Sequence, residues 1–443
     1  MTKKIGFTFL GGVALFLVLG NLTRIDFFAA SMGSGNLSEL VLYIFAIFCA
    51  YIVSKRLFNC QLFLILTSGV IFSLLVGLVK WGIDATAISY NVRLILQIIT
   101  SAVTGVFLYE RYSDNVRRFI GAYLFLYGVI VALSYLIFLA FPDTGTLLAT
   151  LGEAGIEFRG DAHVDRLVST YLDPNYFSII IVLPIIFWLY SFLRNHSLFG
   201  GLFGAIALGA LFLTVSRSGL SLFLLFSIVL LAGNLLELVG SFRLKKSFIF
   251  IMVTFLFGTS LLLVVDSPFL NRITDRFTNI SSDGSALERF DSFNIGMELL
   301  TEEPLLGYGY NYSVRHIIAI RGIGLPGLDS SLQGVLVNFG LIPSLCLTIL
   351  LLLWWTRVNL ILKKYGGASD VYSTWRLVTI YIVLSLLWAA NFNPVLLYPF
   401  WLVPILSILM YFGFIANGKK RFVTMRKSDL SSFVSGGKNE NSL

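Results

Sequence analysis

The sequence predicts an all-α, polytopic membrane protein with about twelve transmembrane helices. Of its 443 residues, 57% are hydrophobic and only 13% are charged, and the mean hydropathy is +0.86. A soluble domain has about 45–50% apolar and about 25% charged residues. The apolar residues also come in long runs instead of the periodic faces of soluble helices. The composition excludes a disordered, a collagen-like and a disulfide-rich secreted protein.

Twelve apolar segments are long enough to cross a bilayer, which takes a helix of about 20 mostly apolar residues with its backbone hydrogen bonds satisfied internally. They lie near residues 5–21, 38–54, 61–79, 88–108, 119–141, 171–193, 199–215, 218–239, 247–265, 332–356, 376–391 and 395–416. The first follows Lys3 and Lys4 as a signal peptide would. Its apolar run is rather long for a signal peptide, which favours an uncleaved helix.

The basic residues orient the chain. With the N-terminus in the cytoplasm, 21 of the 32 Lys and Arg residues fall on the cytoplasmic side and ten on the external side, while Arg93 lies within the fourth span. This asymmetry follows the positive-inside rule and predicts that both termini are cytoplasmic. The net charge of +8 is then mostly a topology signal and not a nucleic-acid footprint.

The chain is predicted to form a single transmembrane domain over residues 1–424, with two long external segments at 142–170 and 266–331. Residues 425–443 are polar and rich in Gly, Ser and Asn, so a disordered cytoplasmic tail is predicted there. The three cysteines and three histidines show neither paired nor metal-ligand spacing. The sequence therefore suggests neither a metal site nor a cofactor.

The second external segment contains a pattern typical of an amphipathic helix. Ser285 and Glu288 form an S-x-x-E capping box, and Pro304 ends the pattern. An apolar stripe runs between them, made of Ala286, Phe290, Phe293, Met297 and Leu300. We expect this helix to lie on the membrane surface or on the transmembrane bundle.

Two external arginines are the main candidate site residues. Arg289 lies beside the apolar stripe, where its guanidinium can grip a phosphate at headgroup level or simply snorkel to the surface. Arg217 lies in a Ser-Arg-Ser-Gly break between the seventh and eighth spans, on the side where arginine is disfavoured. A polar break at membrane depth is normally tolerated where it lines a cavity, although an ordinary short loop is the alternative.

Two shorter motifs accompany the arginines. Asp173-Pro174-Asn175 opens the sixth span, with Asp173 placed to cap the helix and Asn175 facing inward. Gly307-x-Gly309 follows the amphipathic helix, as a tight turn or as a phosphate cradle. Mid-membrane charges, which transporters commonly use, are almost absent, and Glu39 falls at a helix end. Any chemistry is therefore expected at the external face.

Taken in order, D-P-N at 173–175, S-R-S-G at 216–219 and R-x3-F…P-x-x-G-x-G from Arg289 to Gly309 resemble the O-antigen polymerase/O-antigen ligase superfamily of bacterial inner-membrane glycosyltransferases. The resemblance runs from the sixth to the tenth span. It implies a GT-C-like helical bundle, a donor glycan on undecaprenyl pyrophosphate and an acceptor sugar hydroxyl outside the membrane. It also implies that no metal or cofactor is needed.

By this resemblance Arg217 and Arg289 hold the pyrophosphate, whose departing negative charge arginines stabilise. Further candidates for substrate binding are Arg93, Asn175, Arg272, Arg276, Gly307, Gly309, Arg315 and His316. Ligases of the family carry a His-Asn pair just before the tenth span, where this chain has Leu328-Asp329-Ser330. Asp329 is therefore a candidate base for the acceptor hydroxyl, or else a helix cap.

This departure favours a polysaccharide repeat-unit polymerase over a ligase that transfers the glycan to lipid A–core. A transporter of lipid-linked glycans or small solutes is the third hypothesis, and the lack of mid-membrane charge and of inverted repeats disfavours it. The partners implied are an undecaprenyl-pyrophosphate-linked oligosaccharide, membrane lipid, a chain-length regulator protein and a flippase. No nucleic acid is implied.

Overall fold

The chain folds into a bundle of long apolar helices. A computed structural model describes residues 2–25, 35–153, 163–195, 197–241, 284–318, 328, 330–366 and 370–436. Within these ranges eight helices are long and apolar enough to cross a membrane, and three shorter apolar helices accompany them. This agrees with the predicted class of all-α polytopic membrane protein. The predicted span at 247–265 lies outside the described residues.

The long helices of the bundle follow the predicted spans closely. They are α1 (Thr2–Leu19), α2 (Leu37–Ile52), α4 (Gln61–Trp81), α5 (Ala85–Tyr112), α6 (Val116–Ala140), α8 (Pro174–Asn195), α9 (Leu198–Leu213), α10 (Arg217–Ser241), α15 (Leu341–Gly366), α16 (Asp370–Leu384) and α18 (Pro399–Gly436). Several starts are set by caps that the sequence supplies. Asp84 accepts a hydrogen bond from Ala87 N (2.8 Å) at the start of α5, and Asn115 accepts one from Arg118 N (3.1 Å) in α6.

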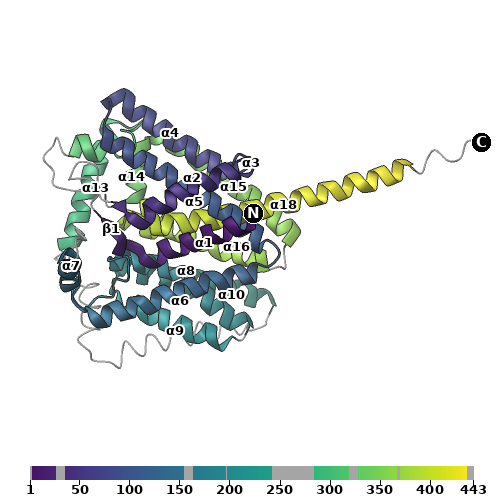
Figure 1. Ribbon diagram of the computed structural model, residues 1–443, viewed down its shortest axis with the longest axis horizontal. Helices are drawn as coiled ribbons and strands as arrows, with labels where there is room; N and C mark the ends of the chain where they lie inside the picture. Colours follow the sequence, from purple (N-terminus) through teal and green to yellow (C-terminus); the bar gives the residue numbers. More distant parts are fainter. Residues whose placement is uncertain are drawn as a thin grey trace, which may run out of the picture.

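Shorter elements connect the long helices. They are η1 (Gly20–Thr23), the antiparallel strands β1 (Arg24–Ile25) and β2 (Gly35–Asn36), α3 (Ser54–Leu57), α7 (Thr144–Glu153), α13 (Gly284–Glu302), the π-helix η3 (Ser313–Ile318), α14 (Ser331–Phe339), the π-helix η4 (Ser385–Ala389), α17 (Ala390–Phe392) and η5 (Val395–Leu397). Figure 1 shows α7 and α13 across one end of the bundle, whereas α1 begins and the extension of α18 emerges at the other. We call the first the α7–α13 end; it is the end predicted to be external.

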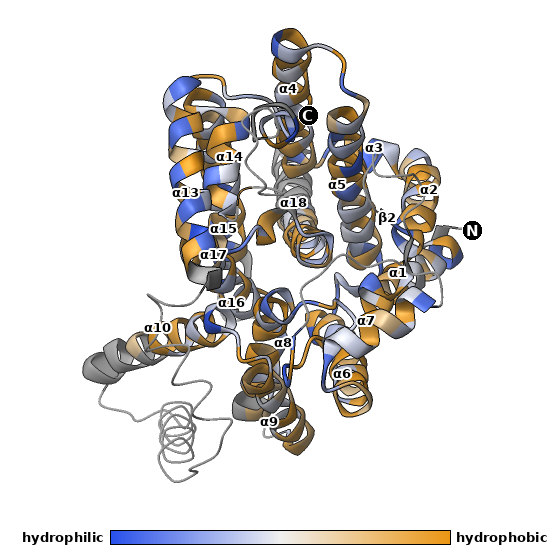
Figure 2. Ribbon diagram, turned by 90° about the vertical axis from the view of Figure 1, so that its left-hand side faces the viewer, coloured by the Kyte–Doolittle hydropathy of each residue, from blue (hydrophilic) through white to orange (hydrophobic). Residues whose placement is uncertain are grey.

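Helices α5 and α18 form the centre of the bundle and pack against each other. In the spanning window of α18, 83% of the residues are buried, against 17% for α15 at the rim. The end-on view shows α18 in the middle of the surrounding helices (Figure 2). Rim helices expose large apolar side chains such as Ile44, Val79 and Leu353, which is how a helix that faces lipid is built.

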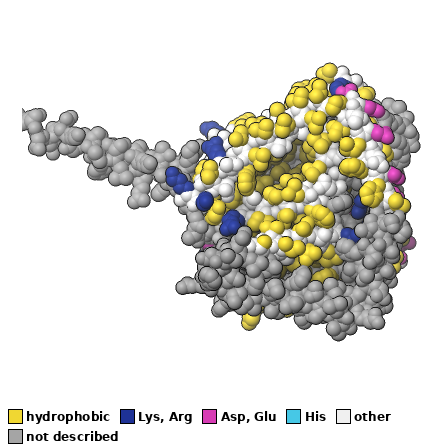
Figure 3. Space-filling model, turned by 180° about the vertical axis from the view of Figure 1, so that it is seen from behind, with side chains coloured by type: hydrophobic (Ala, Val, Ile, Leu, Met, Phe, Trp, Pro, Cys, Tyr) yellow, Lys and Arg dark blue, Asp and Glu magenta, His cyan; other side chains and the backbone are white. Residues whose placement is uncertain are grey.

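The two ends of the bundle differ in charge. Figure 3 shows Lys and Arg side chains gathered on the end from which the C-terminal helix extends, and Asp and Glu side chains along the opposite edge. At the first end Arg56 pairs with Glu110 and Arg117 with Asp370. This distribution is the one that the positive-inside rule predicts for a bundle whose termini share the cytoplasmic side.

The predicted span at 332–356 is interrupted. Gly340 has a φ of 77° and separates α14 from α15, and its N–H donates to the carbonyl of Leu336 (2.7 Å) as the end of α14. The left-handed conformation is accessible to glycine because it has no Cβ, which is why helices commonly end at one. The hydropathy window could not detect this break because apolar residues lie on both of its sides.

Helix α18 continues to Gly436, beyond the apolar segment that ends near residue 416. Residues 425–436, which were expected to be disordered, are therefore helical. No proline or glycine occurs between Gly418 and Gly436, and Lys, Arg and Met are good helix formers, so nothing in the sequence stops the helix earlier. The remainder of the predicted tail, residues 437–443, lies outside the described residues.

Candidate functional site

Most of the predicted site residues that the structure describes lie in elements at the α7–α13 end. Arg217 begins α10, Asn175 lies in the first turn of α8, and Arg289 lies in α13. Arg315, which is half-buried, and the backbone of His316 belong to the π-helix η3. Arg272, Arg276 and Asp329 lie outside the described residues.

Five polar side chains meet where α8 and α10 begin, and we call them the α8 cluster: Arg166, Asp173, Asn175, Ser216 and Ser218. Buried Arg166 donates from Nη2 to Asn175 Oδ1 (3.2 Å) and from Nε to the carbonyl of Thr214 (2.9 Å). Ser216 Oγ donates to the same Asn175 oxygen (3.2 Å) and lies 3.1 Å from Ser218 Oγ. Asn175 is thus the point at which the D-P-N and S-R-S-G motifs meet.

The S-R-S-G segment follows a strained turn. Val215 has a φ of 48°, in the left-handed region that a β-branched residue rarely adopts, so the surrounding structure must hold it there. Beyond the turn α10 lies very close to α8. A Cβ on Gly219 would overlap that of Ser178 and lie 2.9 Å from its carbonyl carbon. Strained backbone of this kind clusters at functional sites, which favours the interpretation as a site over an ordinary loop.

Asp173 caps α8, as the sequence predicts. Its Oδ1 accepts hydrogen bonds from the backbone N–H groups of Asn175 (2.7 Å) and Tyr176 (3.2 Å). Burial raises the pKa of Asp173 above its ordinary value, while these amides and the charges of Arg166 and Arg289 act to lower it. The charge of Arg289 is the smallest of these influences, and it relates α13 to the start of α8 through charge and not through a hydrogen bond.

Helix α13 forms where it was predicted, but its apolar stripe faces away from the protein. Phe290, Phe293 and Met297 are 62%, 49% and 43% exposed. The buried face is made of Ser292, Gly296 and Leu299, and it lies against α14. Half-buried Arg289 lies one turn before Ser292 and therefore on the protein side of the helix, not on its outward stripe.

Gly307 and Gly309 form a turn that is fixed by backbone contacts. Tyr308 N donates to the carbonyl of Val337 (3.0 Å), and Gly309 N donates to that of Asn338 (2.8 Å). A Cβ on Gly309, which has a φ of 91°, would lie 2.6 Å from the Cα of Gly77. The predicted tight turn is therefore correct. In this turn the Gly309 amide is already used, because it donates to the carbonyl of Asn338.

Lys80 holds the same turn from α4. Its Nζ donates to the carbonyl of Gly307 (2.9 Å) and to Glu303 Oε2 (2.6 Å). Trp81 next to it stacks on Tyr308, with ring centroids 5.7 Å apart. The segment after α13 is thus attached to α4 and α14, which fixes the position of α13 itself.

Ser330 is the cap of α14. Its Oγ accepts a hydrogen bond from Gln333 N at 3.3 Å, as an N-cap side chain does. The neighbouring Asp329 is therefore not the cap, and that alternative for its role is removed. The side chain of Asp329 lies outside the described residues.

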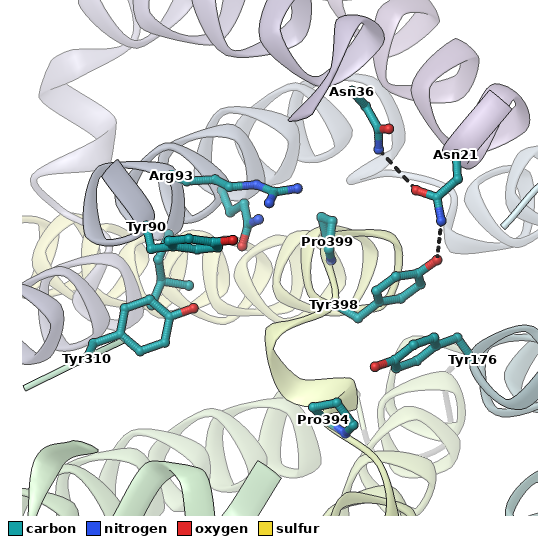
Figure 4. A pocket seen from close by; sticks show the side chains of 11 residues that line it. Asn21, Asn36, Tyr90, Arg93, Tyr176, Tyr310, Pro394, Tyr398 and Pro399 are labelled. Atoms are coloured by element: carbon teal, nitrogen blue, oxygen red, sulfur yellow. Dashed lines mark hydrogen bonds between the residues drawn. The ribbon is translucent and has the colours of Figure 1, made fainter. Parts of the chain in front are cut away.

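A cavity of about 320 Å³ lies beside the α8 cluster, and we call it the tyrosine cavity. Its aromatic lining comes from Tyr90, Tyr176, Tyr310 and Tyr398, and its polar lining from Asn21, Asn36, Arg93 and Gln97. Figure 4 shows the hydroxyl groups of Tyr90 and Tyr310 pointing into the cavity from one side and that of Tyr176 from the other. Tyr176 follows Asn175 directly, so the cavity and the α8 cluster share the first turn of α8.

Arg93 lines this cavity, and Glu39 binds it. Arg93 Nε donates to Glu39 Oε1 (2.8 Å) and Nη2 to Oε2 (2.6 Å), and Glu39 also accepts from Tyr43. The Glu39 side chain is only 3% exposed. Arg93, predicted as a substrate-binding residue, thus lines a cavity, and its charge is compensated inside the bundle.

Sequence reasoning missed Arg166, Glu39 and the four tyrosines. Arg166 had a detectable signal, since it is a basic residue on the side where basic residues are disfavoured. Glu39 gave no such signal, because the helix dipole already favours a carboxylate in the first turn of a helix. The tyrosines come from α5, α8, the segment before η3 and the residue before α18, so only the fold brings them together.

Comparison with known proteins adds no relative to this geometry: no family model, no curated protein and no solved structure matches the chain. What the structure itself establishes is an all-helical chain with multi-pass membrane character. It carries a polar cluster in which Arg166 binds Asn175 and a tyrosine-lined cavity at the same end of the bundle.

Proposed function

We propose that the chain is a membrane glycosyltransferase that polymerises polysaccharide repeat units. It transfers a glycan from undecaprenyl pyrophosphate to a sugar hydroxyl of another lipid-linked repeat unit. One observation carries the proposal: Arg217 and Arg289 come from separate segments and lie around the start of α8, where Arg166 positions Asn175, at one end of a lipid-facing bundle. A lipid-linked pyrophosphate would present its charge at this depth of the membrane.

The chemistry needs this concentration of positive charge. The acceptor oxygen forms a bond to the anomeric carbon of the donor while the bond from that carbon to the pyrophosphate oxygen breaks. The pyrophosphate leaves with the electron pair, and guanidinium groups that bind it stabilise the charge as it develops. Asn175 has its oxygen held by Arg166 and Ser216, so its amide nitrogen can donate to a phosphate oxygen.

The acceptor hydroxyl also has to lose its proton. Asp329 is our candidate for the base, because Ser330 and not Asp329 caps α14. A carboxylate within hydrogen-bond reach of a sugar hydroxyl can accept the proton as the new bond forms. Asp173 is less suited to this task, since its Oδ1 is occupied by the two amides of the α8 cap.

In this proposal the α7–α13 end is the external face of a bacterial inner membrane and both termini are cytoplasmic. A chain-length regulator and a flippase would act with the enzyme. A ligase that transfers the same glycan to lipid A–core uses the same donor chemistry, so the acceptor decides between the two.

The test is deletion of the gene in the host that carries it, followed by separation of the extracted glycolipids on a gel. The loss of a polymerase leaves single repeat units on the lipid. The loss of a ligase leaves bare core and polymer that stays on undecaprenyl pyrophosphate. A glycolipid ladder that the deletion leaves unaltered would exclude both enzymes.

Complementation then tests the site. Arg217→Ala and Arg289→Ala should abolish polymer at normal levels of the inserted protein, and lysine at either position should rescue poorly because an ammonium cannot reproduce the bidentate fork. Arg118→Ala is the matched control, since Arg118 is exposed at the opposite end of the bundle. Near-normal polymer with either alanine variant would remove that arginine from the site.

A further inference from the structure

The tyrosine cavity contains a buried acceptor without a partner. Asn36 is 5% exposed, and its Nδ2 donates to Asn21 Oδ1 (3.2 Å), while its own Oδ1 has no hydrogen-bond partner among the residues that the structure describes. A buried polar atom in this state is costly unless a ligand or an ordered water completes it. Asn36 lines the cavity with this oxygen behind the surface, so Asn36 helps to fix the wall while the hydroxyl groups of Tyr90 and Tyr310 face a ligand.

The aromatic wall of the cavity is held in place. Tyr176 and Tyr398 stack with centroids 4.0 Å apart and planes 9° from parallel. Asn21 Nδ2 lies 3.2 Å from the hydroxyl of Tyr398 and also donates to the carbonyl of Tyr171. Such fixed aromatic rings offer a flat apolar face together with a polar edge, which suits a ligand with both kinds of surface.

The tyrosine cavity and the α8 cluster differ in net charge. Arg93 and Glu39 compensate each other through two hydrogen bonds, and the other lining side chains are uncharged. Around the α8 cluster, the charges of two arginines, Arg166 and Arg289, instead act on the one carboxyl of Asp173. An anionic group therefore gains more from the α8 cluster, and a neutral polyhydroxyl ring gains more from the cavity.

The size and position of the cavity fit one part of the substrate. Its volume of about 320 Å³ is at the small end of ligand sites, which span about 300–1,000 Å³, so it suits one or two sugar rings and not a long chain. Asn175 and Tyr176 are consecutive residues, whose Cα atoms are about 3.8 Å apart. A sugar attached to a phosphate at Asn175 could therefore enter the cavity beside Tyr176.

We infer that the tyrosine cavity binds a neutral sugar residue of the glycan, at a subsite distinct from the arginines that bind the pyrophosphate. The ring lies against Tyr176 and Tyr398, and its hydroxyls bind the phenols of Tyr90 and Tyr310. This assignment deepens the proposed function and rests on it for the identity of the substrate, but sugar binding can be measured without any transfer.

The experiment uses the full-length protein purified in detergent and saturation-transfer difference NMR. The probes are neutral methyl glycosides of glucose, galactose, mannose, rhamnose, N-acetylglucosamine and N-acetylgalactosamine, with methyl glucuronide as the acidic counterpart. We expect at least one neutral glycoside to bind more tightly than the glucuronide. Tyr310→Phe removes one neutral hydrogen bond and should weaken this binding about two- to tenfold.

Two controls make the result specific. Tyr51→Phe changes a tyrosine that is 83% exposed at the opposite end of α2 and should leave the affinity unchanged. Arg217→Ala should also leave it unchanged, because the sugar subsite does not include that arginine. The inference is overturned if no neutral glycoside binds, if the glucuronide binds better, or if Tyr310→Phe behaves like Tyr51→Phe.

The same measurements separate this inference from the proposed function. An unaltered glycolipid ladder together with neutral-sugar binding that depends on Tyr310 would refute the polymerase and keep the sugar site. A lost ladder together with the absence of sugar binding would keep the transferase and refute the subsite.

Discussion

Arg93 of α5 and Glu39 of α2 bind each other through two hydrogen bonds, from Nε to Oε1 at 2.8 Å and from Nη2 to Oε2 at 2.6 Å. Gln97, one turn further along α5, lies 3.4 Å from the same carboxylate. The pair joins the N-terminal part of the chain to the central helix at the wall of the tyrosine cavity. It also makes that wall neutral, which decides what kind of ligand the cavity can hold.

Removing one member of this pair should destabilise the protein. Glu39→Gln leaves the guanidinium without its carboxylate, and we expect a loss of about 2–3 kcal/mol. This is less than the roughly 3–5 kcal/mol of a fully buried pair, because the Arg93 side chain keeps 30% exposure. The double variant Glu39→Leu/Arg93→Met should recover most of the loss. Apparent melting temperatures in detergent measure this, and additive losses in the double variant would contradict the coupling.

Asp173 should make the stability depend on pH. Because burial raises its pKa above the ordinary 3.8, the folded protein binds the proton more tightly than the unfolded chain does. The stabilising contribution is thus fully present below about pH 4 and is lost as the pH rises through the raised pKa. Asp173→Asn does not titrate and should be more stable than the wild type at pH 7, with the difference shrinking toward pH 4. Parallel unfolding curves at all pH values would contradict this.

The close approach of α8 and α10 should not tolerate a methyl group at Gly219. Gly219→Ala places a Cβ against Ser178, and since backbone lies behind that side chain, we expect a loss of about 1–3 kcal/mol and lower activity. Gly121→Ala in α6 is the matched control, because nothing lies within 4 Å of its Cβ position. Thermal unfolding of both variants measures the difference, and equal melting temperatures would argue against a tight α8–α10 contact at the site.

Arg166 should act as a positioning residue. Arg166→Ala removes the hydrogen bonds to the carbonyl of Thr214 and to Asn175, so both the strained turn at Val215 and the amide of Asn175 lose support. With hydrogen bonds of a charged donor worth about 1.5–3 kcal/mol each, we expect a lower melting temperature and reduced polymer. Arg166→Lys should restore part of the polymer but little of the stability. The reverse pattern would indicate direct phosphate binding instead of positioning.

The sequence alone determined the features that depend on neighbouring residues. Long apolar runs gave the spanning helices, and side chains within three residues of a helix start, such as Asp84, Asn115 and Asp173, gave their caps. The periodic pattern and Pro304 likewise located α13, although the helix begins at Gly284, one residue before Ser285 of the predicted capping box. These signals are local because the backbone hydrogen bonds of a helix join residues four apart.

Only the tertiary structure decided which candidates form a site. Glu39 and Arg93 are 54 positions apart, Arg166 and Thr214 are 48 apart, and Lys80 and Gly307 are 227 apart. No helix period relates such residues, because their contacts arise from how the helices pack in the bundle. The same packing gave α13 its orientation, with Arg289 inward and Phe290 outward, whereas the apolar stripe alone left open whether it faces the membrane or the bundle. The physical reason is close packing against α14: Gly296 leaves room for the Gln333 side chain, whose Nε2 donates to the carbonyl of Phe293 (2.6 Å), and such contacts between distant residues cannot be derived from the helix period.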